Sequence, residues 1–112
     1  MERRKSRRFS IVNLDLHDQV TGHLVGKVVN ISRGGMLTTT EKAYEPGKEY
    51  GFYIPFEQTV NGLVKFEFSG RVIWCRPNAL KPGMLSVGLE FADNPKIQTI
   101  FIEQMIKIYG AD

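Results

Sequence analysis

Residues 63–76 read LVKFEFSGRVIWCR and form the clearest β-strand pattern in the chain. Apolar residues occupy every second position, and charged or polar residues occupy most of the positions between them. Because successive side chains of a strand point to opposite faces of a sheet, this alternation predicts a long strand with one buried face. We expect Phe66, Phe68 and Trp74 to pack in the core from this face, and we expect a twist or bulge at Gly70.

Shorter strand patterns flank this segment on both sides. They are rich in Val, Ile, Leu, Phe, Tyr and Thr, and clusters of Gly, Pro, Asn and Asp separate them. The first of them alternates apolar and polar residues, so it should have one buried face and one solvent-exposed face. The expected strands are residues 9–16, 21–29, 36–40, 49–55 and 84–91.

The hydrophobic period changes near the end of the chain. From Ile97 to Ile108, apolar residues recur at helical spacing. Because Asn94 can cap a helix and Pro95 suits its first position, we expect one amphipathic helix over about residues 94–109. Six short strands would leave exposed edges unless the sheet closed on itself. The sequence thus predicts an all-β fold, a small six-stranded antiparallel β-barrel with a C-terminal α-helix that caps an open end or lies on the wall.

Length, composition and charge limit the organisation of the chain. With 112 residues, of which 42% are hydrophobic, it fits one folded domain and is too short for a two-domain enzyme. Its net charge is +3, but residues 1–10 carry +4 and the remainder therefore carries −1. We expect a flexible basic arm over residues 1–8 and a single domain over residues 9–112. This near-neutral domain lacks the spread of Lys and Arg typical of a protein that coats duplex DNA.

Several other classes of protein are excluded by residue usage. Cys75 is the only cysteine, which excludes an intramolecular disulfide and a Cys-rich zinc module and indicates a reducing compartment. His17 and His23 have no partners at a metal-ligand spacing, so we expect no metal site. No apolar run is long enough to cross a bilayer or to form a secretory signal, so we expect a cytoplasmic location without membrane insertion. We also find no nucleophile with a base and no paired carboxylates at catalytic spacing, which argues against an enzyme.

Two segments carry residue types that suit a nucleotide. Residues 4–8 read RKSRR and precede the first expected strand, and residues 30–35 read NISRGG and follow the second. A guanidinium can bond phosphate with both arms of its fork, and it can bond guanine or stack on it. The Asn30 amide can meet the edge of a base, the Ser32 hydroxyl can donate to a phosphate, and the glycines allow close approach of backbone N–H groups. Either segment alone is more often a solvated tail or a hairpin turn, and only the combination indicates a ligand site.

The two segments together resemble the PilZ domain family. The family pattern, RxxxR followed by [D/N]xSxxG, is present here at residues 4–8 and 30–35, and residues 87–91 (VGLEF) end the last strand as in the family. The resemblance covers the whole chain in order. It implies a six-stranded β-barrel that binds the bacterial second messenger cyclic di-GMP and acts as a receptor or adaptor without catalysis and without another cofactor.

The resemblance also implies which residues bind the ligand. Two registers of the arm have the same spacing, and we favour the one whose second arginine directly precedes Phe9, the apolar start of the first strand. The implied ligand residues are Arg4, Arg8, Asn30, Ser32 and Gly35, with Arg3, Arg7, Gly34 and Gly88 as further candidates.

The family pattern allows aspartate or asparagine at position 30, and this chain has asparagine, which is less suited to bonding guanine. An aspartate there would accept hydrogen bonds from both donors on the Watson–Crick edge of guanine, whereas the Asn30 amide offers one acceptor and two donors. We therefore expect weaker guanine binding than an aspartate at this position would give.

Three hypotheses of function stay open. In the first, cyclic di-GMP orders the basic arm against the barrel, and the new surface is offered to an unidentified protein partner. In the second, the chain is a small OB-like protein that binds single-stranded nucleic acid, although the charge of −1 outside the arm argues against a nucleic-acid partner. In the third, a PilZ-like module docks a partner without ligand, although the intact arginines argue against it. The oligomeric state is open as well.

Overall fold

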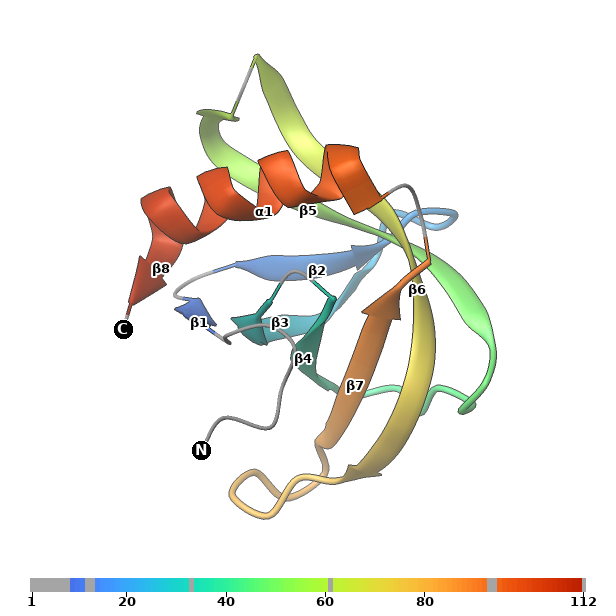
Figure 1. Cartoon of the computed structure of the whole chain (residues 1–112). Helices are drawn as coiled ribbons and strands as arrows, with labels where there is room; N and C mark the ends of the chain where they lie inside the picture. The colour runs from blue at the N-terminus through green and yellow to red at the C-terminus, as the bar shows by residue number, and fades with distance from the viewer. Residues whose placement is uncertain (1–8, 12–13, 33, 61, 93–94, 112) are drawn as a thin grey trace, which may run out of the picture.

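The computed structural model describes residues 9–11, 14–32, 34–60, 62–92 and 95–111. Within these ranges, one antiparallel sheet curls into a barrel and one helix lies across an end of it (Figure 1). The elements are β1 (Phe9–Ile11), β2 (Asp15–Asp18), β3 (Leu24–Ile31), β4 (Gly35–Thr40), β5 (Glu49–Val60), β6 (Leu63–Pro77), β7 (Leu85–Phe91), α1 (Pro95–Tyr109) and β8 (Gly110–Ala111).

Pairing between β2 and β3 closes the barrel. The strands follow each other in the order β2-β5-β6-β7-β4-β3, each neighbouring pair is antiparallel, and β2 pairs with β3 as well as with β5. The short strands β1 and β8 extend the sheet from β3. The expected six-stranded antiparallel barrel with a C-terminal helix is confirmed. Closure satisfies the backbone groups at both edges of the sheet, which is why six strands can form it without a second layer.

The expected strand over residues 9–16 appears as two elements, β1 and β2. Both pair with β3, because Ser10 lies opposite Asn30 and Asp15 lies opposite Lys27. The chain takes five steps from Ser10 to Asp15 while β3 takes three, so the pairing register changes by two residues. Alternation of apolar residues carries no signal for such a change.

The core of the barrel is apolar and rich in aromatic rings. The ring centroids of Phe66 and Phe68 lie 5.2 Å apart, and Phe68 also contacts Phe52 at 5.7 Å, so the expected burial of Phe66 and Phe68 is confirmed. Ile102 and Met105 of α1 are fully buried in the same core, which shows that the helix caps an open end of the barrel. The buried apolar residues are Leu14, Leu16, Val28, Ile31, Met36, Tyr44, Phe52, Ile54, Phe66, Phe68, Val72, Val87, Leu89, Ile102 and Met105.

A β-bulge in β6 changes the face on which its last residues lie. Val72 pairs with Leu89 of β7 and Trp74 pairs with the next residue, Gly88, so Ile73 is the extra residue of the bulge. We expected a twist or bulge at Gly70, and the bulge lies three residues further along the strand. One extra residue moves every later side chain to the opposite face of the sheet.

Trp74 consequently lies on the outer face of the barrel, and its expected place in the core is wrong. Its side chain is half-buried, whereas Cys75, the next residue, pairs with Val87 and packs against the core. The strict alternation seen in the sequence predicted the reverse, because it contained no sign of the extra residue at Ile73.

Candidate ligand-binding site

The loop between β3 and β4 is held by its own hydrogen bonds. The backbone N–H of Ser32 donates to the carbonyl oxygen of Gly35 at 2.9 Å, and the Ser32 hydroxyl donates to the same oxygen at 3.5 Å. Ser32 is only 5% exposed. Its hydroxyl, which we expected to meet a phosphate, thus also stabilises the turn that separates the two strands.

The two glycines of this loop meet different surroundings. Gly35 is buried in β4, and a Cβ atom there would run into the carbonyl oxygen of Leu89 on β7. Glycine at this position is therefore required by close packing of two strands, whatever the ligand requires. Gly34 is exposed, a Cβ atom there would meet open space, and its carbonyl oxygen accepts from the N–H of Phe91 at 2.9 Å. A side chain at position 34 is therefore tolerated by the fold.

Asn30 is one of the residues that line a surface hollow of about 300 Å³. It is half-buried near the end of β3, next to a register irregularity between Val28 and Asn30. On one side it pairs with Ser10 of β1, and on the other with Leu37 of β4. We call this hollow the Trp74 hollow, and its lining residues are Asn30, Met36, Leu37, Ile73, Trp74, Gly88 and Leu89.

Gly88 makes room for the indole of Trp74. A Cβ atom at position 88 would lie 2.7 Å from both Cε2 and Nε1 of the ring, closer than real Cβ atoms come. The indole thus rests over the backbone of β7 and presents a flat apolar surface to the hollow. The strand pattern placed Trp74 in the core and so did not mark it as a site residue. The available signal was a glycine between Val87 and Leu89, which marks close approach of a large group inside a strand.

The arm residues Arg3, Arg4, Arg7 and Arg8 lie outside the described residues, as does Arg33 in the loop. The structure does locate the point at which the arm joins the fold. Phe9, the first described residue, pairs with Ile31, and Ser10 pairs with Asn30. Phe9, which directly follows the arm in sequence, therefore lies at the end of β3 where the loop motif begins.

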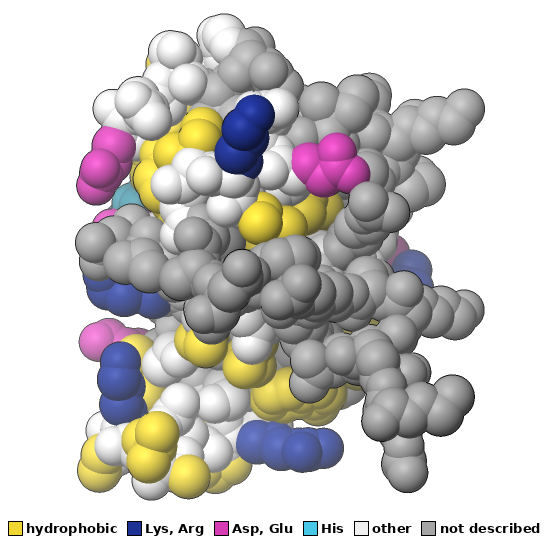
Figure 2. Space-filling view, turned by 60° about the vertical axis from the view of Figure 1, so that its left-hand side comes forward, with side chains coloured by type: hydrophobic (Ala, Val, Ile, Leu, Met, Phe, Trp, Pro, Cys, Tyr) yellow, Lys and Arg dark blue, Asp and Glu magenta, His cyan; other side chains and the backbone are white. Residues whose placement is uncertain are grey.

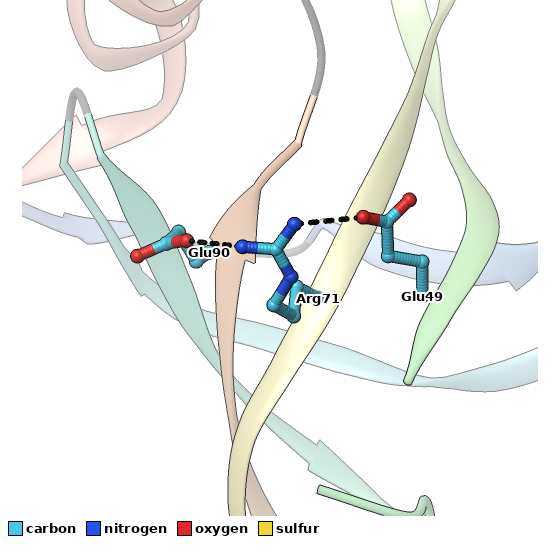
Figure 3. A network of polar contacts seen from close by, with 3 residues as sticks. All are labelled: Glu49, Arg71 and Glu90. Atoms are coloured by element: carbon cyan, nitrogen blue, oxygen red, sulfur yellow. Dashed lines mark hydrogen bonds and ion pairs between the residues drawn. The ribbon is translucent and has the colours of Figure 1, made fainter. Parts of the chain in front are cut away.

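Charged groups on β6 are arranged differently on the two sides of the bulge. Before it, the Arg71 guanidinium bonds Glu49 of β5 at 2.9 Å and Glu90 of β7 at 3.3 Å (Figure 3). After it, the Arg76 guanidinium lies over the Trp74 ring, 5.0 Å from the centroid. Figure 2 shows hydrophobic side chains beside Lys and Arg side chains in the lower part of the face it draws. Arginines thus occur both in an ion-pair network and against an aromatic ring.

Metal-ligating side chains do not cluster in the described part of the chain. Among residues 9–11, 14–32, 34–60, 62–92 and 95–111, no three His, Cys, Asp or Glu side chains come together to hold a metal ion. The helix within these ranges is not long and apolar enough to span a lipid bilayer.

Comparison with known proteins identifies a family. The family model described as PilZ domain matches residues 2–107, which is nearly the whole chain. No curated protein sequence matches closely enough to count as a relative.

Three solved structures share the fold at low sequence identity, and each comparison covers 96% of this chain. The PilZ domain with c-di-GMP of YcgR from Escherichia coli has a TM-score of 0.70, is 14% identical and is covered over 92% of its length. The inhibitor of motility MotI/DgrA from Bacillus subtilis has a TM-score of 0.71, is 17% identical and is covered over 51%. YcgR from Escherichia coli in complex with c-di-GMP has a TM-score of 0.69, is 14% identical and is covered over 46%. The chain therefore spans about half the length of the last two.

Proposed function

Because the chain belongs to the PilZ domain family, we propose that it is a receptor or adaptor for cyclic di-GMP in the bacterial cytoplasm and catalyses no reaction. The observation that carries this proposal is the Trp74 hollow. The hollow is lined both by the amide of Asn30, which can bond a base edge, and by the flat indole of Trp74. It lies near the end of β3 that pairs with Phe9, the residue after the arm. Two of the structural neighbours are described as containing c-di-GMP, which supports the choice of ligand.

The hollow has the groups that a guanine base needs. An aromatic ring offers a stacking surface for a base, and a stack of this kind contributes about 1 to 3 kcal/mol. Asn30 lines the same hollow, and an amide side chain can bond the edge of a base. We propose that Trp74 stacks on one guanine and that Asn30 bonds its edge, with Gly88 holding the indole in place.

The arm provides the positive charge that the ligand needs. Cyclic di-GMP carries two phosphates, while residues 9–112 carry a net charge of about −1 by sequence and the arm region carries +4. We propose that Arg4 and Arg8 bond guanine and phosphate, with Arg3 and Arg7 as the alternative register. The phosphates then neutralise part of the positive charge of the arm, which favours an arm placed against the barrel. The surface formed by the arm and the barrel is the signal to a protein partner.

Ser32 and Gly35 serve this site mainly through the loop. Their hydrogen bonds and close packing set the position of the chain between β3 and β4. We propose that the exposed backbone at Gly34 and the hydroxyl of Ser32 complete the phosphate contacts at this turn, with the hydroxyl exchanging its 3.5 Å bond to Gly35 for a bond to phosphate.

Isothermal titration of the full chain with cyclic di-GMP tests the proposal. We expect saturable binding of this ligand and much weaker binding of GTP and of the linear dinucleotide. Trp74 is the only tryptophan of the chain, so its fluorescence should change in the same titration. Absence of binding and of any fluorescence change would overturn the proposal. Strongly salt-dependent binding of single-stranded oligonucleotides instead would favour a nucleic-acid-binding protein.

A further inference from the structure

We propose that Arg76 is a further ligand-binding residue, which supplies a phosphate-binding guanidinium from the barrel itself. This inference rests on the proposed function, since it assigns a role in binding the same cyclic dinucleotide. It adds a cation on a rigid strand to the cations of the arm.

The bulge at Ile73 places Arg76 beside the Trp74 hollow. Trp74 and Arg76 are two residues apart on β6, so they share the outer face of the barrel, where they pair with Gly88 and Ser86 of β7. The guanidinium carbon of Arg76 lies 5.0 Å from the centroid of the Trp74 ring. Any base stacked on the indole would bring its phosphates close to this charge.

Arg76 also differs from the other arginine of β6 in how its charge is used. Arg71 is held between the carboxylates of Glu49 and Glu90, each of which contacts one of its two terminal nitrogens (Figure 3). Among the residues that the structure describes, Arg76 forms no ion pair, and its guanidinium contacts the ring of Trp74. Its fork of donors is therefore available to a phosphate, whereas that of Arg71 is not.

The contact with Trp74 orients the guanidinium of Arg76 and leaves it able to bind a phosphate. A cation over an exposed aromatic ring is held weakly, and a charge-assisted hydrogen bond to phosphate is stronger. A bound dinucleotide can therefore draw the guanidinium from the ring face to a phosphate. Without ligand, the ring restricts the positions that the guanidinium takes. Lysine would keep the charge but would lose both the planar stack and the bidentate fork.

Titration calorimetry with cyclic di-GMP at low and at high salt tests the role of Arg76. The variants are Arg76→Ala, Arg76→Lys and, as a control that removes the same charge from the same strand, Arg71→Ala. We expect Kd to rise about tenfold for Arg76→Ala, by a smaller factor for Arg76→Lys, and by less than about twofold for Arg71→Ala. The salt dependence of Kd should decrease for Arg76→Ala because one phosphate contact is lost.

Each possible result has a clear meaning. If the wild-type chain binds and Arg76→Ala binds equally well, the role of Arg76 is wrong while the proposed function stands. Equal losses for Arg76→Ala and Arg71→Ala would also overturn it, because they would show only a general effect of charge. If the wild-type chain does not bind, the proposed function fails, and this inference fails with it. Circular dichroism should show all variants folded, since both arginines are exposed.

Discussion

The β3–β4 loop and the Trp74 hollow both belong to the candidate site, yet the fold uses their key residues differently. In the loop, Ser32 is buried and bonded to Gly35, and a side chain at position 35 would meet backbone. In the hollow, the space left by Gly88 is filled by a half-exposed indole. The comparison shows that a glycine of a binding motif can be required by strand packing, as Gly35 is, whatever the ligand requires.

The largest effect is expected at Gly35. In Gly35→Val the new side chain meets the carbonyl oxygen of Leu89 between two paired strands, and neither backbone can move away cheaply. We expect a loss of about 3 kcal/mol in the free energy of unfolding or failure to fold, which urea denaturation would measure. Wild-type stability together with lost ligand binding would contradict the structural role given to this glycine.

Replacement of the arm arginines should affect binding alone. Arg4→Ala and Arg8→Ala should each weaken cyclic di-GMP binding by about 1.5 to 3 kcal/mol, the range for hydrogen bonds to charged groups. Titration calorimetry measures the loss, and thermal melting should remain at the wild-type value. Arg3→Ala is the matched control for register. A larger effect of Arg3 than of Arg4 would shift the assignment by one residue.

Gly88→Ala is the counterpart of the change at Gly35. The new methyl group would lie 2.7 Å from the indole, which is a side chain and can turn away, so the barrel should remain folded. Because the stacking surface moves, we expect ligand binding to weaken by about 1 to 2 kcal/mol, with an altered fluorescence spectrum of Trp74. A variant that unfolds like Gly35→Val would remove the distinction between the two regions.

Asn30→Asp should strengthen guanine binding by about 1 kcal/mol. A carboxylate can accept from both donors of the base edge, while its repulsion of the ligand phosphates is reduced by solvent and by the arm arginines. Titration with cyclic di-GMP and with cyclic di-AMP measures the specificity of this gain, since adenine lacks the paired donors. Equal weakening for both ligands would mean that position 30 experiences only phosphate charge.

The smallest effect is expected far from the site, at the turn after β2. The backbone N–H of Thr21, and after it that of Val20, lower the pKa of Asp18 below its ordinary value of 3.8. A group with a lowered pKa stabilises the fold above its unfolded pKa, and this contribution disappears as the pH falls through the folded value. Denaturation from about pH 6 to about pH 3 should therefore show a steeper loss of stability for the wild type than for Asp18→Asn. Identical pH profiles would show that the turn does not depend on this charge.

Local patterns were sufficient for most of the architecture. The alternation along residues 63–76, the turn residues between strands and the helical spacing from Ile97 to Ile108 predicted the strands, the helix and the closed barrel. These features could be predicted because backbone geometry gives strands and helices different side-chain periods, which are visible in one segment at a time. The spacing of residues 30–35 likewise indicated a candidate loop without knowledge of its partners.

Tertiary structure decided the features that depend on pairing between distant segments. The bulge at Ile73 follows from how β6 pairs with β7, and it turned Trp74 outward and placed Arg76 beside it. The register change between β1 and β2 follows in the same way from their pairing with β3. The sequence of a strand shows the period of its apolar residues, but it does not show an extra residue that pairing with the neighbouring strand requires. One extra residue moves every later side chain to the opposite face of the sheet. For that reason the motifs were visible in the sequence, while the aromatic surface between them appeared only in the fold.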